Sequence, residues 1–181
     1  NFLFKYFFKR QKKIFENVIF FARKKKTNVH VLCKTSNARE ISLEKNFFLD
    51  NKNKLKNIKF CSEDRKKFEI IDKAEMIITL NSTLGYEAFS RKKKIIFFNL
   101  YDNKKTYETA NFAWPCKLKR NGFFWTDDLT DKNCFKYFEK IYNLTVPAWE
   151  KIYKKIFKNI MVRDYNNSIF KKNLKKHLGT K

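Results

Sequence analysis

The stretch AEMIITLNSTLGYEAFSRKKKIIFFNL, residues 74–100, decides how this chain folds. Two short apolar runs, IITL and IIFFNL, stand on either side of a small polar turn and three consecutive lysines. β-branched and aromatic runs of this length favour strands, whereas STLGYEAFSRK suits a helix whose first turn holds the Ser-Thr pair. The stretch therefore predicts a strand over residues 75–80, a helix, and a second strand over residues 94–100.

The same alternation continues upstream. Strands are predicted within residues 28–37 and over 57–63, and helices over residues 3–25, 40–50 and 64–74. Strands that alternate with helices and lack simple hairpin turns indicate βαβ crossovers, which join parallel strands. The sequence predicts an α/β fold: a Rossmann-like parallel sheet flanked by helices.

Downstream, an aromatic and irregular stretch from residue 101 precedes further helices over residues 131–142 and 147–162 and a basic terminal helix. Pro147 suits the first turn of a helix, and Thr145 lies close enough to cap it. We expect three parts: an N-terminal amphipathic helix over residues 1–27, a Rossmann-like core over 28–130, and C-terminal helices packing on the core over 131–181.

The chain is strongly basic. Its 181 residues include 42 Lys+Arg against 18 Asp+Glu, a formal net charge of +24 that attracts nucleic acid, anionic lipid or a nucleotide-linked substrate. Alternatively, the positive charge has no functional meaning and reflects the bias of an AT-rich genome toward Lys, Asn, Ile and Phe. The 43% apolar content and 21 phenylalanines exclude a disordered chain.

Cysteine usage and hydropathy exclude several classes. The four cysteines are widely spaced without a CxxC pair, so neither a metal site nor a disulfide framework is indicated, and a cytosolic protein with reduced thiols is expected. Lysines interrupt every apolar run before it reaches the roughly 18–20 residues of a membrane span. The first residues reverse the charge order of a signal peptide and lack Met, so we expect a fragment or a trimmed chain.

The polar turn is the candidate ligand site, because open α/β sheets bind ligands where a strand ends and the next helix begins. The hydroxyls of Ser82 and Thr83, with the first N–H groups of the helix, are donors for a phosphate. Gly85 lacks a Cβ and permits close approach, and Glu87 can accept hydrogen bonds from ribose hydroxyls. Alternatively, Ser82 or Thr83 only caps the helix and Glu87 completes a capping box.

Other candidates are weaker. Lys34 ends the first predicted strand and would face the same cleft, where its ammonium balances phosphate charge, but an ordinary solvated lysine is the favoured explanation. His30 lies inside a strand pattern, which favours a half-buried structural residue over a catalytic base. Asp127 and Asp128 are adjacent acids for which no further oxygen ligands to a metal are identifiable.

The quoted stretch, together with FAWPCKLKRNGFFW (residues 112–125) and DYNNSIFKKNL (residues 164–174), resembles the C-terminal, donor-binding domain of GT-B glycosyltransferases. The likeness is greatest to bacterial surface-carbohydrate biosynthesis transferases, whose pattern is S-T-x-G-Y-E-A-x-x-x-G-K followed by a strand. The resemblance implies one half of a GT-B fold and a nucleotide-sugar donor. The expected donor-binding residues are Asn81, Ser82, Thr83, Gly85, Tyr86, Glu87 and Lys34.

Two features depart from that pattern. Lysines at positions 92–94 replace the usual Gly-Lys, which is harmless if they are solvated. The His-Pro pair of the CMP-sugar group is missing from VLCKTSN, residues 31–37, which weakens the case for a CMP-linked donor.

The resemblance implies a glycosyltransferase of cell-surface polysaccharide or lipopolysaccharide biosynthesis, acting in the cytoplasm without metal or cofactor. Its partners would be the nucleotide-sugar and a glycan or lipid-linked acceptor, with peripheral contact to anionic membrane and no specific nucleic acid. The catalytic base is unknown and expected on an N-terminal half. The alternatives are a polyol-phosphate transferase of similar fold, or a basic module that binds RNA or anionic membrane without catalysis.

Overall fold

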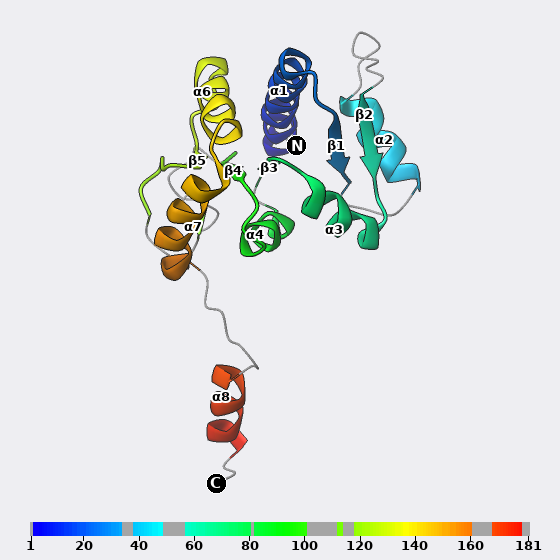
Figure 1. Cartoon of the computed structure of the whole chain (residues 1–181). Coiled ribbons are helices and arrows are strands. Elements are labelled where there is room, and N and C mark those ends of the chain that lie inside the picture. Colours follow the sequence, from blue (N-terminus) through cyan, green and yellow to red (C-terminus); the bar gives the residue numbers. More distant parts are fainter. Residues whose placement is uncertain are drawn as a thin grey trace.

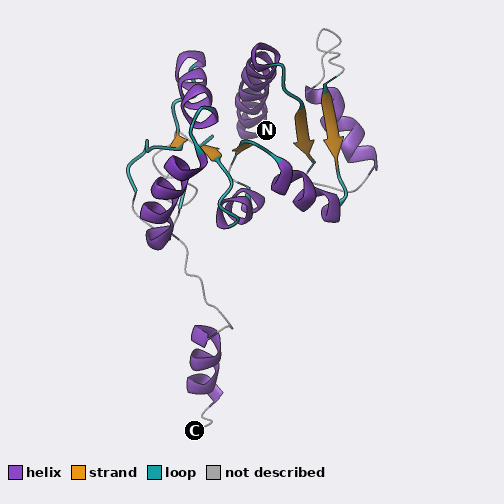
Figure 2. Ribbon diagram, viewed as in Figure 1, coloured by secondary structure: helices purple, strands orange, loops and turns teal. Residues whose placement is uncertain are grey.

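The computed structural model describes residues 2–33, 38–48, 57–80, 82–100, 112–113, 118–160 and 168–178. Its architecture is α/β, with short parallel sheets flanked by helices, as the alternating pattern predicted (Figures 1 and 2). None of the described helices is both long and apolar enough to cross a bilayer.

The strands form two hydrogen-bonded sets, both parallel. In one set β1 (Val29–Leu32) pairs with β2 (Ile58–Cys61), and in the other β4 (Ile95–Phe98) lies between β3 (Ile77–Thr79) and β5 (Trp125–Thr126). From left to right, Figure 1 shows the order β5, β4, β3, β1, β2. All pairings within the two sets are parallel, as βαβ crossovers require.

Seven helices complete the described structure. Their bounds are α1 Phe2–Lys25, α2 Ala38–Phe48, α3 Asp64–Lys73, α4 Thr83–Ser90, α6 Asp131–Tyr142, α7 Val146–Ile160 and α8 Ser168–Leu178. Each of them was predicted from the sequence, and the predicted cap at Thr145 is confirmed, because its Oγ1 accepts the Ala148 N–H at 3.4 Å. The sequence did not predict β5, and it wrongly placed His30 of β1 as half-buried, since that side chain is exposed.

The core gathers around β4. Its four residues, IIFF, are all buried, because α1, α4 and α6 contribute apolar side chains around them. On the α4 side, Phe89 is fully buried and meets Trp149 and Tyr153 of α7 at ring centroid distances of 6.4 and 5.0 Å. Each buried aromatic of this kind contributes on the order of 1.5–3 kcal/mol, so α7 is held by its apolar face.

The lysines at positions 92–94 are not simply solvated. Lys92 is exposed but adopts a left-handed φ of 63°, and the 92 and 93 amides donate to Phe89 O and Ala88 O, which closes α4 with a Schellman motif. Lys94 Nζ donates to the carbonyls of Tyr142 and Leu144 at 2.8 and 3.2 Å, and burial lowers its pKa. The basic triplet therefore ends one helix and caps another.

Candidate functional site at the carboxyl edge of the sheet

The turn between β3 and α4 lies where the sequence placed it. Ser82 is the N-cap residue of α4, with extended φ and ψ of −95° and 137°, and its side chain makes no capping hydrogen bond. Gly85 stands at the third helical position, where a capping box would need Glu or Gln, so the alternative of a capping box with Glu87 is wrong. The Ser82 and Thr83 side chains are both exposed at the helix start.

Gly85 is buried against the strand that precedes it. A Cβ built on Gly85 would lie 2.7 Å from both Cγ2 and Oγ1 of Thr79. Gly85 thus lets α4 pack closely on the end of β3, and the atoms nearest to it belong to the Thr79 side chain. This contact fixes the direction in which the first turn of α4 points.

Thr83 and Glu87 share the solvent side of α4. They are one helical turn apart and both exposed, whereas Gly85, Ala88 and Phe89 form the buried side. Thr83 and Glu87 are therefore neighbouring positions on the same face of α4. The face combines hydroxyl donors with a carboxylate acceptor, the pair of functions that a nucleoside phosphate requires.

Tyr86 is half-buried and tied to a distant part of the chain. Its hydroxyl accepts the backbone N–H of Ala113 at 2.8 Å, and its ring stacks on Phe112 at 5.9 Å with an interplanar angle of 9°. Ala113 is buried and has a left-handed φ of 66°. Tyr86 thus positions residues 112–113 beside α4.

Two predicted site residues, Lys34 and Asn81, lie outside the described residues. The chain before Lys34 is well defined: Cys33 is buried, and its N–H donates to Cys61 O at 2.8 Å. Burial, with the Glu44 carboxylate nearby, raises the pKa of the Cys33 thiol to about 11. This cysteine is therefore a protonated core side chain at neutral pH.

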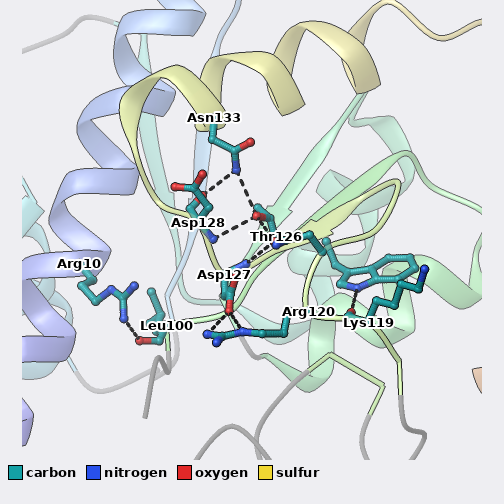
Figure 3. A network of polar contacts seen from close by, with 10 residues as sticks. Arg10, Leu100, Lys119, Arg120, Thr126, Asp127, Asp128 and Asn133 are labelled. Atoms are coloured by element: carbon teal, nitrogen blue, oxygen red, sulfur yellow. Dashed lines mark hydrogen bonds and ion pairs between the residues drawn. The ribbon is translucent and has the colours of Figure 1, made fainter. Parts of the chain in front are cut away.

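A polar network surrounds the carboxyl end of β5 (Figure 3). The buried Thr126 hydroxyl donates to Asn121 Oδ1 at 2.6 Å and accepts from Asn133 Nδ2 and the Asp128 N–H, both at 3.1 Å. Asn133 Nδ2 also donates to Asp128 O at 2.8 Å. The network fixes the turn from β5 into α6, which lies at the same edge as the start of α4.

The two adjacent acids have structural partners. Asp127 forms an ion pair with Arg120, and Asp128 Oδ1 accepts the Thr130 N–H at 3.0 Å at the start of α6 (Figure 3). No group of three or more His, Cys, Asp or Glu that could hold a metal occurs among the described residues.

Arg10 of α1 also reaches this edge, and the sequence analysis missed it. Its Nη1 donates to the carbonyl of Leu100, just beyond β4, at 2.6 Å (Figure 3). The two residues are 90 positions apart. Only the charge and helical periodicity of α1 were visible in sequence, and neither says which strand end the guanidinium meets.

Parallel strands, flanking helices and a polar strand-to-helix turn at the carboxyl edge define an α/β protein of the Rossmann-like class. The chain belongs to a family described as "putative O-antigen biosynthesis protein", whose model matches residues 1–178. The family description places the chain in surface-carbohydrate biosynthesis. No significant match was found among curated proteins or among solved structures.

Proposed function

We propose that this chain is the nucleotide-sugar-binding part of a glycosyltransferase that acts in O-antigen biosynthesis. The observation that carries the proposal is the start of α4, where the exposed hydroxyls of Ser82 and Thr83 follow the carboxyl end of β3. Open α/β sheets bind nucleotides at the carboxyl ends of their parallel strands, and this turn follows the carboxyl end of a strand that pairs in parallel with β4. The family description supplies the biosynthetic context.

The chemistry assigned to this edge is binding and leaving-group stabilisation. The first N–H groups of α4 and the two hydroxyls would hold the donor phosphates, and Glu87 would accept hydrogen bonds from a sugar or ribose hydroxyl. Lys34, which follows β1 in the sequence, would add a positive charge. When the bond to the sugar breaks, these fixed donors stabilise the negative charge that develops on the departing nucleotide.

The acceptor would be a glycan or a lipid-linked glycan at the cytoplasmic face of the membrane, as the biosynthetic context requires. General-base catalysis is assigned to another part of the enzyme, because the residues named at this edge are assigned to donor binding. The chain described here would therefore supply donor binding.

Calorimetric titration of the chain with CDP, CMP, UDP and GDP tests the proposal. We expect one of these nucleotides to bind, and Ser82→Ala/Thr83→Ala to weaken binding at least about tenfold, since a hydrogen bond to a charged group contributes about 1.5–3 kcal/mol. Ser90→Ala is the matched control, because its hydroxyl donates to Glu87 O at the other end of α4. Absence of nucleotide binding, or equal affinity in the double variant, would refute the proposal.

A further inference from the structure

Helix α7 carries a straight row of lysines on its solvent side. The four are exposed and spaced by three or four residues, so they fall on one face over about 10 Å of helix. They are Lys151, Lys154, Lys155 and Lys158. The opposite face holds the buried Trp149 and Tyr153, which fixes the row toward solvent.

Helix α8 repeats the arrangement. Its four lysines are exposed and lie at adjacent positions one turn apart, namely Lys171, Lys172, Lys175 and Lys176. Leu174 lies at the edge of this row and is 44% exposed. Figure 1 shows α8 set apart from the other elements, beyond the end of α7.

None of these eight lysines forms an ion pair with a residue in the described part of the chain. Basic side chains elsewhere do so, as in the pairs Lys13–Asp131 at 2.9 Å and Arg91–Asp72 at 2.8 Å. Like charges one turn apart repel and weaken a helix, so both rows cost stability when nothing neutralises them. This cost indicates an anionic surface as the partner.

We propose that the α7 and α8 lysine rows form a docking surface for an anionic phospholipid bilayer. Lysine stems are apolar and flexible, so their ammonium groups reach lipid phosphates while the methylenes lie along the headgroup region. Leu174, next to the α8 row, is an exposed aliphatic side chain, which suits contact with acyl chains.

Docking does not depend on nucleotide binding, since Ser82 and Thr83 lie on α4. It would hold the donor-binding edge near a membrane, where a lipid-linked acceptor resides. The two proposals therefore fail separately: Ser82→Ala/Thr83→Ala should leave vesicle binding unchanged.

The test is co-sedimentation of the full chain with vesicles of phosphatidylcholine alone or with about one third phosphatidylglycerol. We expect binding only to the anionic vesicles, with affinity that falls as NaCl is raised. Each lysine near an anionic surface contributes about fivefold to partitioning. The α7 variant, Lys151→Gln/Lys154→Gln/Lys155→Gln/Lys158→Gln, should therefore bind the anionic vesicles at least about tenfold more weakly. The corresponding four-lysine variant of α8 should show a loss of vesicle affinity of the same size.

A control removes the same charge from exposed lysines of other elements: Lys59→Gln/Lys73→Gln/Lys132→Gln/Lys136→Gln. It should change partitioning less than about twofold in the same assay. Equal losses in control and row variants would overturn the proposal, because net charge alone would then explain binding. Vesicle binding retained by both row variants, with loss of binding to a single-stranded RNA oligomer, would overturn it in favour of a nucleic-acid surface.

Discussion

Glycine is needed at position 85 because the packing leaves no room for a Cβ, not because the backbone adopts an unusual conformation. Alanine there would gain about 1 kcal/mol of helix propensity but would place a Cβ 2.7 Å from the buried Thr79 side chain, an overpacking that costs about 1–3 kcal/mol. We expect Gly85→Ala to lower the free energy of unfolding, measured in urea. Adding Thr79→Ala should recover part of the loss, and a net gain in the single variant would contradict the close packing of α4 on β3.

Lys92 occupies a position at which glycine would be more stable. Its φ of 63° closes α4, and the interactions made there, including Trp149 Nε1 to Lys92 O at 2.7 Å, involve the backbone. Lys92→Gly should therefore raise the free energy of unfolding by about 1 kcal/mol. Lys136→Gly, at an exposed position in the middle of α6, should lower it by a similar amount. A change of the free energy of unfolding in the same direction for both variants would contradict this explanation.

Helices α1 and α6 are joined by a pH-sensitive contact. Lys25 and Lys24 of α1 reach the Glu139 carboxylate at 2.7 and 3.2 Å, and these bonds lower its pKa to about 2. The stabilisation is present above the ordinary glutamate pKa of about 4.5 and is lost as the pH falls toward 2. Glu139→Gln should lower the melting temperature at pH 7.

That difference in melting temperature should close progressively below about pH 4.5 in differential scanning fluorimetry, because wild-type Glu139 then becomes neutral too. In a double-mutant cycle at neutral pH, Glu139→Gln should have little further effect in a Lys24→Gln/Lys25→Gln background. A difference that stays constant with pH would show that lost packing, not charge, explains the effect.

Most elements could be predicted because their cause is local. The apolar periodicity of residues 131–142 predicted α6 to the residue, and Thr145 with Pro147 marked the start of α7. Strand β5 is only two residues long and exists because Trp125 and Thr126 pair with β4. A strand of that length has no periodicity to detect.

The candidate site could be predicted in place but not in detail. The Ser-Thr turn was identified because a strand and a helix adjoin it in sequence. Contacts such as Tyr86 to Ala113 and Arg10 to Leu100, 27 and 90 positions apart, depend on how the elements pack. The alternative capping role of Glu87 is wrong because the helix begins at Thr83, which puts Glu87 at the fifth helical position instead of the third.

Over the whole molecule, charge repulsion opposes folding. With 42 basic against 18 acidic residues, compacting a chain of net charge +24 costs free energy that salt screens. We expect the melting temperature to rise with NaCl, by roughly 2–4 °C for each kcal/mol of repulsion removed. The four-lysine variant of α7 has four fewer positive charges and loses no ion pair with the described residues, so it should melt higher at low salt and respond less to NaCl. A melting temperature that falls with salt would mean that the ion pairs, such as those of Glu139, outweigh the repulsion.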